Sequence, residues 1–178
     1  MLERFHKHFG VESAQYKWLM QDLAKAAAPA QRKKVPWIIV LSHRPMYHTA
    51  RHHPNCGGDG DWSICMVREL YEPLFEQHQV DVYFSGHSHH YMRSKPMLRG
   101  KVADNGTTHI IVGTGGFEVL GERWGSNADW VAARQGSRFG FGRYRIANAT
   151  HLQWVRAEGR GRRRLTTLPR PGPRGLCK

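Results

Sequence analysis

The 178-residue sequence has few cysteines and no long apolar run, and each shortage excludes a class of protein. No stretch approaches the roughly 18 consecutive apolar residues of a membrane-spanning helix. The chain opens with Met-Leu-Glu-Arg-Phe-His-Lys, which lacks the apolar segment of a secretory signal peptide. Its three cysteines, Cys56, Cys65 and Cys177, show no C-x-x-C spacing, so a structural zinc site is not expected.

Acidic residues are also scarce, since 14 Asp and Glu stand against 27 Lys and Arg and the formal net charge is +13. Such an excess can indicate a polyanionic partner. Here eight basic residues and one acidic residue fall in the last segment, residues 156–178. This Gly-, Pro- and Arg-rich segment has neither apolar periodicity nor interleaved aromatic residues. We therefore predict a disordered, solvated tail there rather than a nucleic-acid-binding arm, and a folded portion at residues 1–155.

The patterns of apolar residues in the folded portion predict an α/β fold. Helices are expected at residues 14–28 and 65–79, the first capped by Ser13, and Pro73 is expected to kink or divide the second. A continuous apolar run predicts a strand buried on both faces at residues 36–41, and two further strands are predicted at residues 80–84, also buried, and 109–112. The order of strands and helices indicates a parallel sheet, and residues 139–146 and 151–155 indicate a closing antiparallel hairpin.

Two sequons, Asn105-Gly-Thr and Asn148-Ala-Thr, make Asn105 and Asn148 candidate glycosylation sites. They favour an exported protein, which we would expect to begin before Met1, because the chain itself opens without a signal peptide. Cys56 and Cys65 could pair across the glycine-rich turn between them or remain free thiols. The sequence leaves both arrangements open.

Histidine, in contrast, is abundant, and three of the twelve histidines follow predicted strands. His43 follows the first strand, and His87 and His89 follow the second in the turn Gly86-His-Ser-His. Functional groups gather beyond the carboxyl ends of parallel strands, and Gly86 can adopt backbone angles closed to other residues. This freedom would aim both imidazoles at one point. Because neutral imidazole binds zinc, iron and manganese, we predict that His43, His87 and His89 are metal ligands.

Carboxylates that would complete such a site are not evident in the sequence. Two ions about 3.5 to 4 Å apart that cleave a phosphoester need carboxylates to bridge and neutralise them. The candidates are poorly placed, with Asp59 and Asp61 in a loop, Asp81 in a buried strand, and Asp104 and Asp129 in turns.

Two segments, Val40-Leu-Ser-His43-Arg-Pro and Gly86-His87-Ser-His89-x-Tyr91-x-Arg93-Ser, resemble the last two of the five metal-binding blocks of purple acid phosphatases. These enzymes are calcineurin-like metallophosphoesterases. The similarity covers most of the chain, from Ser-Ala-Gln-Tyr-Lys-Trp-Leu at residues 13–19 to the closing segment at residues 139–151. It implies the C-terminal half of a four-layer α/β/β/α domain, a β-sandwich with flanking helices.

The resemblance also implies a role for each histidine. His43 and His87 would bind the divalent ion, which is zinc, manganese or iron in the family, and His89 the ferric ion. His52 and His53 match a pair of loop histidines that contact the substrate phosphate and protonate the leaving group. Paired imidazoles beside cations suit both tasks. The implied protein is an acid phosphatase for phosphate monoesters, a possible homodimer, located outside the cell or in a lysosome or vacuole.

The family's first three blocks supply two aspartates, a tyrosine, an asparagine and a further histidine, and should lie before Ser13. They are absent from the sequence. We therefore expect a truncated product, an incomplete gene model or a remnant, with weak or no hydrolysis by this chain alone. Two alternatives remain open: an inactive module that binds a metal ion or phosphate, and a phosphodiesterase or nuclease of the same superfamily.

Overall fold

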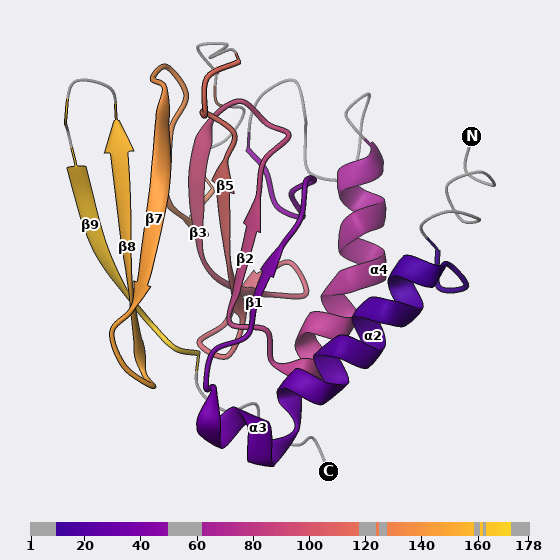
Figure 1. The fold of residues 1–178 in the computed structure, drawn as a ribbon. Helices are drawn as coiled ribbons and strands as arrows, with labels where there is room; N and C mark the ends of the chain where they lie inside the picture. The colour runs from indigo at the N-terminus through magenta and orange to yellow at the C-terminus, as the bar shows by residue number, and fades with distance from the viewer. Residues whose placement is uncertain are drawn as a thin grey trace.

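The structure, a computed structural model, describes residues 10–49, 62–117, 124, 128–158, 161 and 163–171. They form three layers, in which a six-stranded sheet lies between α-helices and a three-stranded sheet (Figure 1). The elements are α2 (Ala14–Ala27), α3 (Pro29–Lys34), β1 (Ile39–Leu41), α4 (Trp62–His78), β2 (Val82–Ser85), β3 (Tyr91–Leu98), β4 (Lys101–Val102), β5 (Thr107–Val112), β6 (Val131–Gln135), β7 (Gly140–Ile146), β8 (His151–Glu158) and β9 (Arg163–Pro169).

The two long helices match the sequence prediction closely. The Ser13 side chain accepts a hydrogen bond from the backbone N–H of Tyr16 at 3.1 Å, which caps α2 as expected. Pro73 lies inside α4 but does not divide it, because α4 continues from Trp62 to His78. Among the described residues, no helix is both long and apolar enough to cross a membrane.

The central sheet has the strand order β1-β2-β5-β3-β4, with β6 paired to β3. Strands β1, β2 and β5 are parallel, which confirms the predicted parallel sheet. Strand β3 then runs antiparallel to β5 and β6. The parallel part therefore brings the carboxyl ends of β1, β2 and β5 to one edge of the molecule, where ligand sites of α/β sheets form.

Strand β1 differs from its prediction as a strand buried on both faces. Its residues are half-buried or exposed, and Leu41 is 69% exposed. The reason is its position, since β1 ends the strand order in the described part of the chain and pairs with β2 alone. An end strand has one neighbouring strand instead of two, so its last side chains reach solvent.

The second sheet contains the predicted hairpin of β7 and β8, but also a strand where the sequence predicted disorder. Strand β9 pairs along β8, with Leu168 opposite Leu152, and both side chains are buried. Beyond β9, Arg170 Nε lies 3.4 Å from Oδ1 of the buried Asp81. Backbone pairing, one buried leucine and this ion pair thus order a segment whose composition alone indicates a tail.

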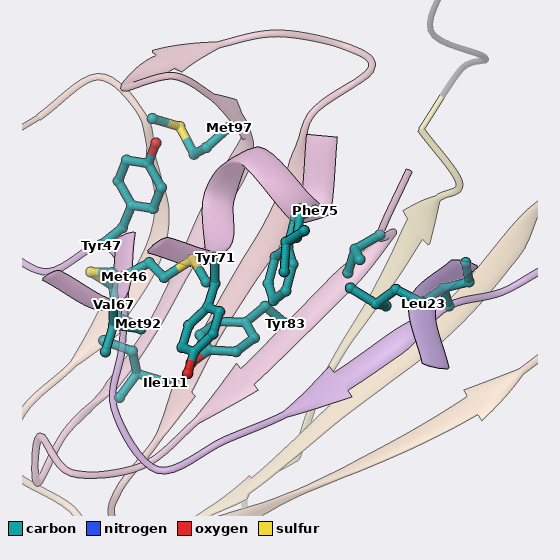
Figure 2. Close-up of a cluster of buried hydrophobic side chains, with 13 residues drawn as sticks. Leu23, Met46, Tyr47, Val67, Tyr71, Phe75, Tyr83, Met92, Met97 and Ile111 are labelled. Carbon is teal, nitrogen blue, oxygen red and sulfur yellow. The ribbon is translucent and has the colours of Figure 1, made fainter. Parts of the chain in front are cut away.

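Two clusters of buried side chains hold the layers together. The first lies between α2, α4 and the central sheet, and includes Tyr71, Phe75 and Tyr83 (Figure 2). The second lies between the two sheets, where Trp154 of β8 packs on Phe84 with ring centroids 5.1 Å apart. The central sheet is therefore covered on both faces, which fixes the position of its strand ends.

Candidate metal centre

The predicted metal ligands lie where β1 and β2 end. The Ser42 N–H donates to the Phe84 carbonyl at 3.0 Å, which extends the pairing of the two strands by one residue. The Gly86 N–H then donates to the His43 carbonyl, also at 3.0 Å. These two bonds tie the segments after both strands to each other, so His43 and the turn that begins at Gly86 are held side by side.

The turn itself has an unusual backbone, but not at the position that the sequence indicated. His87 has a φ of +61°, in the left-handed region, whereas Gly86 is not among the glycines of positive φ. A Cβ at Gly86 would meet its nearest neighbour, the His43 carbonyl oxygen, at an ordinary 3.9 Å. The sharp bend therefore lies at a histidine. A positive φ at a non-glycine residue strains the backbone, and such strain is found often at functional sites.

The end of β5 supports this turn from the other side. Gly113 follows β5, and its N–H donates to the His90 carbonyl at 3.1 Å. A Cβ at this position would lie 1.8 Å from the backbone oxygen of Ser88, which is far inside contact distance. Only glycine lets the two backbones approach so closely.

His43 and His87 are brought together by this framework. The Nδ1 atom of His87 lies 3.3 Å from Nε2 of His43, and the rings meet edge to face with centroids 5.1 Å apart. Two nitrogen ligands about 2.0–2.1 Å from one tetrahedral zinc ion are separated by about 3.3–3.4 Å. The observed separation therefore fits two imidazoles that share one ion.

Arg44 sets the proton positions of the pair. Its Nη1 lies 3.2 Å from Nε2 of His87 and donates to the Ser63 hydroxyl. A guanidinium can only donate, so Nε2 of His87 accepts and the ring proton lies on Nδ1, facing His43. Metal binding through Nδ1 requires the opposite tautomer, in which Nε2 carries the proton and needs an acceptor.

The structure does not group the third predicted ligand, His89, with this pair. His89 is half-buried against Phe117, with ring centroids 5.5 Å apart, and its Nδ1 has no hydrogen-bond partner among the described residues. Within the described ranges, no group of three or more His, Cys, Asp and Glu side chains is arranged to hold a metal ion. His52 and His53 lie outside the described residues.

Two protein families match successive parts of the chain. Residues 3–91 match the calcineurin-like phosphoesterase family, and residues 106–158 match the iron/zinc purple acid phosphatase-like protein C domain. The chain belongs to the purple acid phosphatases, within the calcineurin-like phosphoesterases.

Individual relatives agree with this assignment. Purple acid phosphatase 18 of Arabidopsis thaliana is 37% identical over 145 residues, which cover 80% of this chain and 30% of the relative. The Fe(3+)-Zn(2+) purple acid phosphatase 12 of the same plant is 31% identical, over 85% of this chain and 33% of the relative. A purple acid phosphatase structure from yellow lupin seeds superposes with a TM-score of 0.74 at 26% identity, over 89% of this chain and 28% of the other. The chain thus spans about a third of the length of these relatives.

The candidate aspartates that the structure describes have other roles or positions. Asp81 is buried and accepts from Arg32 Nη1 at 2.8 Å and from the Ile38 N–H at 2.7 Å. It joins α3 to the sheet and is not available as a ligand. Asp104 and Asp129 lie in exposed turns, while Asp59 and Asp61 lie outside the described residues.

Two residues beside the histidine pair were missed by sequence reasoning. Arg44 contacts His87, and the Tyr83 hydroxyl donates to the Arg44 carbonyl at 2.5 Å. Burial raises the pKa of Tyr83, so its hydroxyl remains a donor across the physiological range. The position of Arg44, directly after His43, is the signal in the sequence that could have indicated the first contact.

The structure also describes both candidate glycosylation sites and one of the two cysteines that could pair. Asn148 lies in the exposed connection between β7 and β8, where its Oδ1 accepts from the Thr150 N–H at 2.9 Å. Asn105 is half-buried before β5. Cys65 is disulfide-bonded, while Cys56 lies outside the described residues.

Proposed function

We propose that His43 and His87 bind one divalent ion, and His89 a ferric ion, in the two-metal site of a phosphatase that hydrolyses phosphate monoesters. The observation that carries this proposal is the separation of 3.3 Å between the ring nitrogens of His43 and His87, which fits ligands of a single ion. Membership of the purple acid phosphatase family supports the choice of reaction.

In this proposal, the bound metal pair supplies Lewis acidity and lowers the pKa of water at the site. The residues of the chain would orient the metal ligands and protonate the leaving group. The hydrogen bond from the Gly86 N–H to the His43 carbonyl holds the imidazoles of His43 and His87 side by side. His52 and His53 would donate hydrogen bonds to the substrate phosphate and pass a proton to the departing alkoxide, a contribution of about 10²–10⁴ in rate.

The 178-residue chain is proposed to have weak or no phosphatase activity by itself. Two imidazoles bring no negative charge to an ion, and the described residues offer no third ligand beside them. An ion held in this way is short of its coordination number. Turnover of p-nitrophenyl phosphate by the purified chain, abolished by His87→Ala, would show that this part of the proposal is wrong.

A chimera tests the proposal for the histidines themselves. This chain would replace the matched segment of Arabidopsis purple acid phosphatase 18, which then supplies the rest of the protein. We expect hydrolysis of p-nitrophenyl phosphate that falls at least 10³-fold in His43→Ala, His87→Ala and His89→Ala. His151→Ala is the matched control, because this exposed histidine begins β8. Full activity in a folded His87→Ala chimera would contradict the assignment.

The same chimera distinguishes the alternatives. A phosphodiesterase or nuclease would prefer bis(p-nitrophenyl) phosphate or single-stranded DNA over the monoester. An inactive binding module would give a folded chimera that binds metal without turnover of any of the three. We expect neither result, because the His52 and His53 pair suits protonation of a monoester leaving group.

Further properties are part of the proposal. We propose a binuclear centre of Fe(III) with Zn(II), Mn(II) or Fe(II), and the name of the iron–zinc relative supports the first of these pairings. We also propose glycosylation at Asn105 and Asn148, export to the cell exterior, lysosome or vacuole, and assembly as a homodimer. Mass spectrometry of the protein from a secreting host, before and after glycosidase treatment, tests the glycosylation directly.

A further inference from the structure

A cleft of about 400 Å³ lies between the two sheets, lined by residues of β3, β6, β8 and β9. Three of its lining side chains are arginines, Arg134, Arg156 and Arg164. The remaining lining residues include Tyr91 and Thr166, and none of the lining residues is acidic. The cleft contains none of the predicted metal ligands, and its volume falls within the roughly 300–1,000 Å³ of small-molecule sites.

Two of these arginines form an unfavourable pair in the protein alone. Arg156 of β8 and Arg164 of β9 are direct cross-strand partners on the face that meets the central sheet. Like charges directly opposite each other destabilise a sheet. Arg156 is also only 7% exposed, so its charge is poorly solvated, and burial lowers the pKa of Arg156.

The local carboxylate does not balance this charge. Glu158 contacts Arg156, but it also accepts a hydrogen bond from Arg138 at 3.0 Å. One negative charge is thus shared by two guanidinium groups before Arg134 and Arg164 are considered. In the described part of the chain, Nε of Arg156 is buried without a hydrogen-bond partner.

Two of the three guanidinium groups are held in place before any ligand binds. Cζ of Arg156 lies 4.4 Å from the ring centre of Tyr91, whose hydroxyl accepts from Trp154 Nε1 at 3.2 Å. Cζ of Arg134 lies 4.7 Å from the ring centre of Trp124. Because both rings restrict their arginines, an anion that binds here needs to immobilise few side chains.

We propose that the cleft between Arg134, Arg156 and Arg164 binds the phosphoryl group of a small anion. Guanidinium groups match phosphate oxygens in bidentate geometry, and a dianion would offset the repulsion between the cross-strand arginines. The anion has two sources with the same chemistry, inorganic phosphate and a small phosphate ester. Both fit the cleft, and the experiment below separates them.

The test is thermal unfolding of the full chain with a chelator present, so that phosphate bound through a metal ion does not contribute. Inorganic phosphate and phenyl phosphate are titrated separately, and sodium chloride at matched ionic strength is the reference. We expect a saturable rise in melting temperature with at least one of the two anions and none with chloride. The anion that saturates at lower concentration identifies the source.

Arg164→Gln is the deciding variant, because Arg164 is exposed and its loss removes the like-charged neighbour of Arg156. We expect an apparent affinity for the anion at least tenfold lower, together with an anion-free melting temperature that does not fall. Arg145→Gln, on an exposed residue of β7, is the control and should behave as the unaltered chain. Equal rises in all three proteins, or an equal rise with chloride, would overturn the proposal.

Discussion

Replacement of Gly113 by alanine probes the support of the histidine turn. The added Cβ would lie 1.8 Å from the Ser88 backbone oxygen, while real Cβ atoms essentially never approach non-bonded atoms of other segments within 3.0 Å. The end of β5 and the turn must therefore separate by at least about 1.2 Å. Overpacking of this kind costs about 1–3 kcal/mol of the free energy of unfolding. In a domain of this size, each kcal/mol lowers the melting temperature by about 2–4 °C.

The same shift should weaken zinc binding about 10- to 100-fold, because it carries His87 away from His43, and loss of the contacts that orient a metal ligand has effects of that order on affinity. Gly115→Ala is the matched control, since a Cβ there meets nothing within 4 Å. That change should be neutral or stabilise by about 0.4–1 kcal/mol through the unfolded chain. Melting curves and zinc titrations of both variants measure the contrast. Equal behaviour of Gly113→Ala and Gly115→Ala would refute the reasoning.

Three further predictions concern single side chains. Arg44→Gln should raise zinc affinity about fivefold in a titration, because an amide oxygen can accept from Nε2 of His87, and unchanged affinity would contradict the tautomer argument. Burial lowers the pKa of His109 to about 3 from 6.5, so the free energy of unfolding should fall as the pH falls from 6.5 toward 3. His109→Leu should flatten this dependence when melting temperatures are measured across that pH range. An unaltered slope would contradict the role given to His109. Asp81→Ala should lower the free energy of unfolding in urea by about 3–5 kcal/mol, because Arg32, whose side chain is only 11% exposed, loses its carboxylate partner, whereas exposed Asp104→Ala should cost under 0.5 kcal/mol.

The parallel strands and the hairpin could be predicted from sequence because their local patterns agree with their final surroundings. Strand β2 begins with three apolar residues, Val-Tyr-Phe, and is buried throughout. Strand β3 was not predicted, since it contains Lys95 and Pro96 and has no regular alternation of buried residues. Strand β9 was not predicted because its arginines resemble a solvated tail. Its order comes from pairing with β8, which is a contact that no local pattern encodes.

The candidate site, like the fold, could be predicted from the sequence only in part. The positions of His43 and His87 after two strands were enough to predict that they meet, because parallel strands end at one edge. Spacing also suggested His89, whose role as a ligand stays a prediction; in the structure its ring contacts Phe117, with centroids 5.5 Å apart. The support from Gly113 could not be predicted, since it depends on the approach of β5 to the turn. Backbone contacts between distant segments therefore decide which histidines converge.

The central claim is that His43 and His87 share one metal ion, and a zinc titration of the purified chain tests it most directly. Calorimetry with the unaltered chain, His43→Ala, His87→Ala and the exposed control His151→Ala gives affinity and stoichiometry for each protein. We expect zinc to bind the unaltered chain and His151→Ala with similar affinity. We expect its affinity for His43→Ala and for His87→Ala to be at least 100-fold lower. Zinc binding of equal strength and stoichiometry in all four proteins would contradict it.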